Sequence, residues 1–266
     1  MTSALEQVGN ARIKPNQSDI WKEFCDSITR CNRFFLPSGS TFLEMLSRIG
    51  EAASYHHPVD RPLYRGRMSS SNIDVECYEA VDMLAPSPEC TPDGRANVCG
   101  VPVLYAAEDE RTVVAELRGW KGAELHIVTL QPLRPLNLVD LSRCDAFSIP
   151  HDKDDPSQIE ILRALQLRLN DAFSKPYSDS DSKLNYVPTQ YVASYYKAAG
   201  FDGIRYSSAM DTGGHNVAIF DTTKAVETRS FVRRSIVEAI EYQVKPFIPF
   251  HERPGCRLRV ADEPTN

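Results

Sequence analysis

Arginine, glutamate and hydroxyl side chains stand near glycine-containing segments at three places in the sequence. The side chains that could bind or react with a substrate are Arg65, Arg67, Arg95, Tyr105, Glu116, Tyr206, Ser207, Ser208 and Asn216. A guanidinium group can bind two phosphate oxygens at once, and a carboxylate can orient a ribose hydroxyl or stabilise positive charge on a sugar. The set therefore favours a phosphorylated ligand, although spacing along the chain alone does not bring these groups together.

Glu116 lies near the end of residues 93–118, which read DGRANVCGVPVLYAAEDERTVVAELR. Residues 101–107 form an apolar run that is long enough for one buried strand. A short helix is predicted to follow, with Val113 and Leu117 on its buried face because they are four residues apart. Glu116 stands beside that face, so its carboxylate points either at solvent or at a group that needs a negative charge.

Composition excludes several other classes of protein. The chain has 266 residues, of which 42% are hydrophobic and 25% charged, as in an ordinary globular protein. A net charge of −6 argues against direct nucleic-acid binding, and no apolar run is long enough to span a membrane. The seven cysteines show no CxxC spacing and the N-terminus lacks the apolar core of a secretion signal, which favours free thiols and a cytoplasmic protein.

Metal ligands are not evident in the sequence. His56 and His57 are adjacent, so they cannot share one helix face as the paired histidines of a zinc enzyme do. The phosphate-binding P-loop, the GxGxxG motif and the GxSxG motif are also missing. We therefore predict no metal site, and the common catalytic motifs do not identify an activity.

The N-terminal region is predicted to be helical. Apolar residues recur at helical spacing in residues 19–34 and again in residues 41–53. Residues 1–58 are therefore interpreted as a helical extension, which packs on the following domain or, alternatively, docks a partner. Residues 59–245 are interpreted as the main domain, and residues 246–266 as a C-terminal tail.

In the main domain, strands alternate with irregularly placed helices. Strands are predicted at residues 62–67, 101–107, 123–130 and 136–141. Residues 201–221 are predicted to form a strand, a polar loop with Gly213-Gly214 and a second strand, and two further strands are predicted within residues 223–242. Ser157 and Glu160 form an apparent capping box for one helix, and Gly200 ends another helix at residues 189–199. Without regular βαβ units, this order predicts an α+β fold with a mainly antiparallel sheet.

Three segments together resemble the RES domain, a family named for an arginine, a glutamate and a serine. In LYRGR, residues 63–67, Arg65 matches the family arginine. Residues 94–118 resemble the glycine–arginine turn, apolar strand and helix of the family, and Glu116 there matches its glutamate. The third segment is residues 201–221, FDGIRYSSAMDTGGHNVAIFD. The resemblance extends over about residues 61–222, with the order and spacing of the three segments in agreement.

The family serine corresponds to one of two adjacent residues. Ser208 fits better, because the position after Tyr206 is often proline in the family and Ser207 occupies that position here. The turn that commonly reads GRWN in the family reads Gly94-Arg95-Ala96-Asn97 in this chain, without the tryptophan. Any ligand contact made by that indole ring is therefore not expected here.

The resemblance implies a fold and an activity. The fold would be an ADP-ribosyltransferase-like split antiparallel β-sandwich with surrounding helices. The activity would be NAD+ degradation, in which the nicotinamide–ribose bond is cleaved with water or phosphate as acceptor. Several family members are toxins of toxin–antitoxin systems, so the implied partners are NAD+ and a separate helix-turn-helix (Xre-like) antitoxin. Whether the protein forms a homo-oligomer stays an open question.

The resemblance also assigns roles to residues. Arg65, Glu116 and Ser208 would be catalytic, with Arg65 on the diphosphate and Glu116 on the nicotinamide ribose. The residues implied to bind NAD+ are Tyr64, Arg95, Tyr105, Tyr206, Ser207 and Asn216. Two other functions stay open at this point: a protein mono-ADP-ribosyltransferase that uses the same cleft, and a non-catalytic nucleotide- or partner-binding module that would tolerate loss of Glu116.

Overall fold

Nine strands form one mixed sheet in the computed structural model, which describes residues 19–34, 36, 40–69, 78–143, 156–176, 183–221, 225–229 and 231–241. The strands are β1 (Ser54–His57), β2 (Leu63–Met68), β3 (Leu104–Ala107), β4 (Glu124–Pro132), β5 (Leu136–Asp140), β6 (Gly203–Ser207), β7 (His215–Ile219), β8 (Val226–Thr228) and β9 (Arg233–Ile236). Their order is β1-β5-β6-β7-β3-β2-β4-β8, and β9 also pairs with β4. Among the described strands only β5 and β6 pair in parallel, so the predicted α+β fold with a mainly antiparallel sheet is confirmed.

The sheet is almost divided between β2 and β3. These two strands share a single residue pair, Tyr64 with Ala107, whereas β2 pairs with β4 along its whole length. Buried side chains from both sides of this junction, such as Leu63, Leu104 and Val217, belong to one apolar cluster. The two parts of the sheet therefore curve around a shared core, and the junction between them opens at Tyr64.

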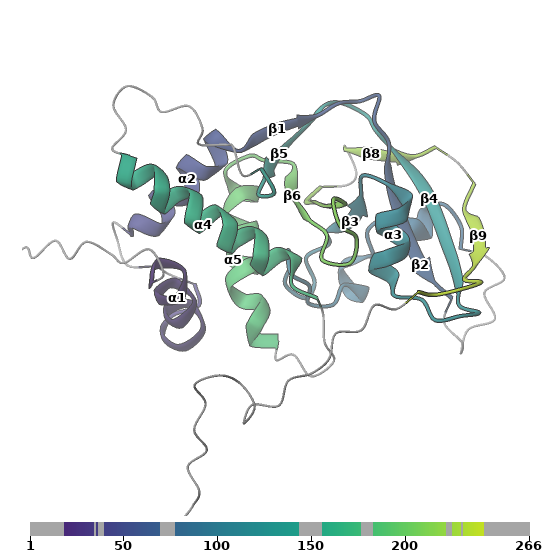
Figure 1. The fold of residues 1–266 in the computed structure, drawn as a ribbon, viewed down its shortest axis with the longest axis horizontal. Helices are drawn as coiled ribbons and strands as arrows, with labels where there is room; N and C mark the ends of the chain where they lie inside the picture. Colours follow the sequence, from purple (N-terminus) through teal and green to yellow (C-terminus); the bar gives the residue numbers. More distant parts are fainter. Residues whose placement is uncertain are drawn as a thin grey trace, which may run out of the picture.

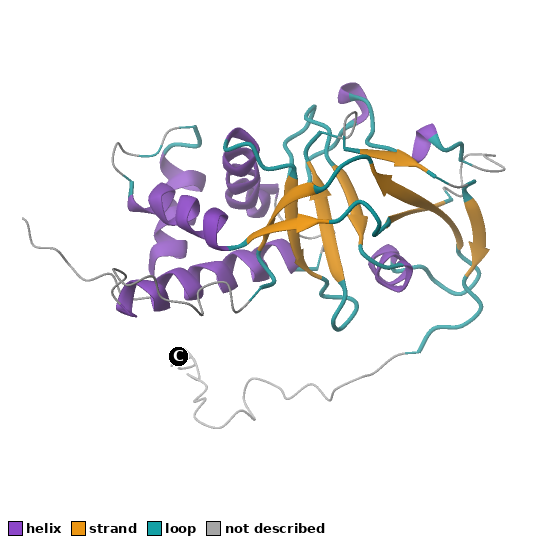
Figure 2. Ribbon diagram, turned by 90° about the horizontal axis from the view of Figure 1, so that it is seen from above, coloured by secondary structure: helices purple, strands orange, loops and turns teal. Residues whose placement is uncertain are grey.

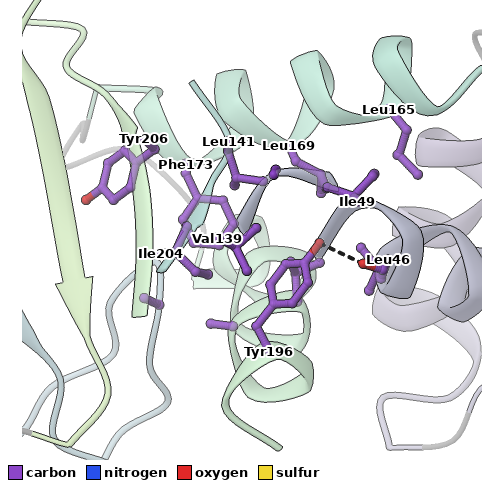
Figure 3. Close-up of a cluster of buried hydrophobic side chains, with 14 of the residues drawn as sticks. Leu46, Ile49, Val139, Leu141, Leu165, Leu169, Phe173, Tyr196, Ile204 and Tyr206 are labelled. Carbon is purple, nitrogen blue, oxygen red and sulfur yellow. Dashed lines mark hydrogen bonds between the residues drawn. The ribbon is translucent and has the colours of Figure 1, made fainter. Parts of the chain in front are cut away.

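Most of the helices lie together beside one end of the sheet (Figures 1 and 2). These are α1 (Asp19–Asp26), which continues as a π-helical turn to Cys31, α2 (Thr41–Ala52), α4 (Pro156–Ser174) and α5 (Val187–Ala198). Their apolar faces form a second buried cluster with β5 and β6, part of which is drawn in Figure 3. The Tyr196 hydroxyl of α5 donates a hydrogen bond of 3.2 Å to the Leu46 carbonyl of α2 in this cluster. The N-terminal helices thus pack firmly on the rest of the chain.

The remaining long helical segment, α3 (Glu110–Leu117), packs on β2 away from this helical group (Figure 1). The predicted two-turn helix after the 101–107 segment is therefore confirmed, although the strand before it is shorter than predicted. Of the helices in the described ranges, none is both long enough and apolar enough to cross a membrane.

Two details of the sequence interpretation need correction. Residues 1–58 are not purely helical, because β1 pairs antiparallel with β5 from Ser54 opposite Val139 to His57 opposite Leu136. The four residues SYHH are too few and too polar to give a strand pattern. The Ser157 capping box is also wrong, since α4 begins one residue earlier at Pro156, and proline suits the first helical turn. The division of the chain into domains stays a prediction.

Candidate active site

Helix α3 presents Glu116 at the open junction of the sheet. Asp109 caps the helix by accepting a hydrogen bond from the backbone of its first turn. Gly66 of β2 lets the helix approach closely, because a Cβ there would lie 2.5 Å from the side chain of Val113 and 2.7 Å from that of Leu117. Any larger residue at position 66 would therefore push α3, and Glu116 with it, away from the strand.

The carboxylate of Glu116 is held by two donors on one of its oxygens. The Ser208 hydroxyl donates to Oε1 at 2.7 Å, and the Asn216 side-chain amide donates to the same atom at 2.6 Å. Within the described part of the chain, Oε2 accepts no hydrogen bond, and the Glu116 side chain is exposed. Glu116 is thus fixed in orientation while one carboxylate oxygen stays available to a ligand.

Two hollows meet at this carboxylate and form one cleft. Both are lined by Glu116, Leu117, Tyr206 and Asn216. The first, of about 210 Å³, is completed by Tyr64, Arg65, Gly66, Tyr105, Ala106, Ala107 and Val113, and we call it the aromatic hollow. The second, of about 300 Å³, is completed by Arg95, Arg118, Phe173, Ser174, Lys175 and Pro176, and we call it the cationic hollow. The cleft therefore has an arginine on each side of Glu116.

Within the described residues, Arg65 and Arg95 each keep a buried donor without a protein partner. Arg65 donates from Nη1 to the Tyr105 carbonyl at 3.1 Å, but its buried Nε has no partner in the described residues. Burial, together with the neighbouring Arg67, lowers the pKa of Arg65 to about 10, so it is still charged at neutral pH. Arg95 lies 5.2 Å from the ring centre of Tyr186, and its buried Nη2 is likewise unpaired there. Both side chains also line the cleft, where a guanidinium group can bind an anion.

Tyr64, Tyr105 and Tyr206, the three tyrosines that the resemblance implied, all line the cleft, but in different ways. Tyr64 and Tyr105 border the aromatic hollow, and Tyr206 borders both hollows. The Tyr105 hydroxyl donates to the Asn97 side chain at 2.7 Å and so fixes the turn that carries Arg95; burial raises the pKa of Tyr105 to about 12. Tyr206 is buried, packs against Phe173 and directs its hydroxyl away from the labelled core side chains (Figure 3).

Arg67, which lies over the Tyr78 ring, and Ser207 are candidate residues that line neither hollow of the cleft. Ser207 is bonded to α4 instead. Its backbone N–H donates to the Asn170 side chain at 3.0 Å, and its hydroxyl accepts from the same amide at 3.2 Å. Ser174 also donates to its carbonyl, so Ser207 is tied to α4. The next residue, Ser208, leaves the strand on the other side and reaches Glu116.

The loop that carries Ser208 is fastened to α3, which the sequence analysis did not predict. The backbone N–H of Asp211 donates to the Ser208 hydroxyl at 3.1 Å, and the Asp211 carboxylate accepts from the buried Thr112 hydroxyl at 2.9 Å. A Cβ on Gly214 would overlap the Thr112 hydroxyl, so only glycine permits this approach. The hydrogen bond between Thr112 and Asp211, which we call the Thr112–Asp211 clamp, brings Ser208 to Glu116. Ser208 and Glu116 are 92 residues apart in the sequence. The only signal for the clamp in the sequence was the glycine pair in this loop.

A second polar cluster fixes the segment between β3 and α3. Arg205 makes two hydrogen bonds of 2.8 Å to the two carboxylate oxygens of Glu108, and a third, of 2.7 Å, to Asp140. His57 and His215 approach the same Glu108 carboxylate at 3.5 and 3.6 Å. Burial alone would raise the pKa of Glu108, but the contacts with His57 and Arg205 outweigh it and hold the pKa at about 2. This cluster joins β5, β6 and β7 to the start of the helix that bears Glu116.

Comparison with known proteins identifies the family. The model of the RES domain matches residues 62–243, which is well over half of the chain, and the chain therefore belongs to the RES domain family. The resemblance found in the sequence is confirmed by this match. Among solved structures, a chain of the M. tuberculosis MbcT–MbcA toxin–antitoxin complex is similar over 72% of this chain and 91% of that chain, with 13% sequence identity and a TM-score of 0.38. No curated protein matches the sequence.

Proposed function

We propose that this protein degrades NAD+ by cleaving its nicotinamide–ribose bond, with water or phosphate as acceptor. The observation that carries the proposal is the Glu116 carboxylate, which is held through Oε1 by Ser208 and Asn216 and keeps Oε2 free in a cleft between two arginines. A fixed carboxylate of this kind can stabilise the positive charge that develops on ribose. The near-division of the sheet at one residue pair supports an ADP-ribosyltransferase-like split sandwich as the underlying fold.

The reaction assigns a task to each group. When the bond between ribose C1 and the nicotinamide nitrogen breaks, the electron pair leaves with nicotinamide and the ribose becomes cationic. Oε2 of Glu116 accepts a hydrogen bond from a ribose hydroxyl and stabilises that cation. Arg65 and Arg95, from the two sides of the carboxylate, hold the diphosphate and so position the ribose. An oxygen of water or phosphate then bonds to C1, and the proton of the attacking group is released.

The aromatic hollow is suited to the leaving group. Nicotinamide is a flat aromatic ring, and Tyr64 and Tyr105 border this hollow. Tyr206 is buried and Ser207 is tied to α4, so their part is to shape and support the walls of the cleft. Ser208 is a positioning residue whose hydroxyl orients Glu116.

The family also suggests the biological setting. We propose that the chain is the toxin of a toxin–antitoxin system and that a separate helix-turn-helix protein of the Xre type neutralises it. The support is membership of the RES family, in which such pairs occur.

The decisive experiment is incubation of the pure full-length protein with NAD+, with and without phosphate, followed by chromatography. Release of nicotinamide is expected in both cases, with ADP-ribose as the second product in water and a phosphorylated ADP-ribose when phosphate is the acceptor. New ADP-ribosyl adducts on added cell proteins would indicate a protein mono-ADP-ribosyltransferase instead. If no nicotinamide is released under any condition, the enzyme proposal fails and a non-catalytic binding module remains.

Arg65→Ala should weaken NAD+ binding by about 1.5–3 kcal/mol, which is the usual contribution of a charge-assisted hydrogen bond. Arg65→Lys should recover only part of this, because an ammonium group cannot make the two-pronged contact with phosphate. Calorimetry in a Glu116→Gln background would measure binding without turnover. Arg67→Ala is the matched control on the same strand, since Arg67 lies over Tyr78, away from the cleft lining. Unchanged affinity in Arg65→Ala would remove Arg65 from the binding site.

Thr112→Val keeps the shape of a buried side chain but removes the hydroxyl that clamps Asp211. We expect kcat to fall about tenfold with little change in KM. When the loop shifts, Ser208 no longer holds the Glu116 carboxylate in its position. In a Ser208→Ala background the same change should have almost no further effect, since groups that act through one another are not additive. Thr29→Val, which removes a hydroxyl bonded within the N-terminal helical segment, is the control. Equal losses in both backgrounds would mean that Thr112 does not act through Ser208.

A further inference from the structure

A third hollow lies between α1 and the C-terminal end of α4, beyond the cleft. It has a volume of about 650 Å³ and includes Trp21 and Lys22 of α1, Arg168 of α4 and Lys175 just after that helix. We call it the α1–α4 hollow. Helix α1 lies outside the residues that the RES model matches, so one wall of this hollow comes from a segment beyond the family domain.

The α1–α4 hollow carries an excess of unpaired positive charge. Lys22, Arg168 and Lys175 face one carboxylate, that of Asp171, and none of the three cations has a hydrogen bond or ion pair in the described part of the molecule. The chain as a whole has a net charge of −6, so this local excess does not follow from composition. Cations gathered in a hollow attract an anionic group and lose mutual repulsion when it binds.

The hollow is continuous with the proposed active site. Ser174, Lys175 and Pro176 line both the α1–α4 hollow and the cationic hollow. The cationic hollow shares Glu116 with the aromatic hollow. The aromatic hollow, the cationic hollow and the α1–α4 hollow therefore follow one another, with Glu116 between the first two and Lys175 between the last two.

This succession matches the order of groups along a nicotinamide dinucleotide. With the nicotinamide ribose at Glu116 and nicotinamide in the aromatic hollow, the diphosphate lies between Arg65 and Arg95, and the adenosine half extends past Lys175. Trp21 is held by its ring contacts with Phe24, at 5.5 Å, and Phe42, so it offers a fixed face for a base. Adenosine itself has no charge beyond the diphosphate, so Lys22 and Arg168 would have no anion to bind if the substrate ended there.

We propose that the α1–α4 hollow binds a phosphate carried on the adenosine ribose, so that the preferred substrate is the 2′-phosphorylated dinucleotide, NADP+. The expected preference in kcat/KM rests on the proposed cleavage reaction, whereas the expected preference in binding does not. Arginine and lysine side chains are the usual partners of a phosphate monoester at such a position.

The binding test uses calorimetry with two adenosine fragments that lack nicotinamide, adenosine 2′,5′-bisphosphate and adenosine 5′-monophosphate. The bisphosphate should bind at least about tenfold more tightly to the wild-type protein, and the difference should fall as salt is raised. Lys22→Gln combined with Arg168→Gln should remove most of the difference. Arg30→Gln is the matched control, because Arg30 is an exposed cation of the same helical segment that pairs with Asp26 outside the hollow. Equal affinity of the two fragments for wild type would overturn the proposal.

The kinetic test compares kcat/KM for NADP+ and NAD+. The wild-type ratio should favour NADP+ by about tenfold, and the double variant should lower this ratio at least fivefold through KM. A ratio near one that the double variant leaves unchanged would overturn the subsite while leaving NAD+ cleavage established. If neither dinucleotide is cleaved, the proposed function fails, and the fragment affinities alone then decide whether the phosphate site exists.

Discussion

Glu116→Gln should bind NAD+ almost as well as the wild-type protein and turn it over at least about a hundredfold more slowly, on the scale seen when one electrostatic group of an active site is removed. The side-chain oxygen of glutamine can still accept the hydrogen bonds that Ser208 and Asn216 donate to Oε1. What the substitution removes is the negative charge at the atom that faces the cleft. That charge matters most when the ribose is cationic, so the loss should appear in kcat and not in affinity.

Nicotinamide release under single-turnover conditions measures this effect directly, and calorimetry on the slow variant gives its affinity. Glu110→Gln is a suitable control, because Glu110 is on the same helix and pairs with Arg233 of β9 outside the cleft. If expression of the wild-type chain arrests growth, Glu116→Gln should be tolerated and Glu110→Gln should not. Turnover at the wild-type rate in Glu116→Gln would exclude a charge-stabilising role for Glu116 and remove the main support for the proposed reaction.

The positions of helices and most strands were predictable because they depend on local patterns. Apolar residues at helical spacing identified α1 and α2, and Gly200, with φ of 89°, ends α5 as predicted. Strand β1 escaped prediction because its four residues are polar enough to resemble a loop, and pairing with β5 alone makes them a strand. Local pattern thus predicts an element well only when the element buries a regular apolar face.

The candidate site was predictable as a set of residues but not as a geometry. Strand alternation places Ser207 and the residues beside it on opposite faces, but it does not say which face meets α4 and which meets α3. That choice depends on the register of β6 against β7, in which Tyr206 stands opposite Asn216. The same register brings Asn216 to the Oε1 atom of Glu116.

The partners in contacts between distant segments could not be identified from the sequence. The Thr112–Asp211 clamp joins residues 99 positions apart, and each is an ordinary polar residue when read in its own segment. The Glu108–Arg205 pair spans 97 positions, and each residue is an ordinary charged residue when read in its own segment. Both pairs become visible when the β2–β3 junction and the loop after β6 are placed in space.

Glu108→Gln should lower the free energy of unfolding by about 3 kcal/mol at pH 7, because removing one partner of a largely buried ion pair, with side chains 14% and 21% exposed, leaves Arg205 incompletely compensated. The folded pKa of Glu108, about 2, lies below the value near 4.3 expected in the unfolded chain. Its contribution is therefore complete above about pH 5 and is lost as pH falls toward the folded pKa. Urea unfolding at pH 7, 5, 4 and 3 should show the difference between wild type and variant shrinking as the solution becomes more acid.

Glu124→Gln provides the matched comparison for this effect. Glu124 also receives two hydrogen bonds from one arginine, Arg234, at 3.0 and 2.7 Å, but that pair lies at the surface between β4 and β9. An exposed pair is screened by water and salt, so its loss should cost much less at every pH. Equal losses in the two variants would show that burial does not strengthen the Glu108 cluster. A large loss confined to Glu108→Gln would identify this cluster, outside the cleft, as the support that fixes the start of α3 and thereby the position of Glu116.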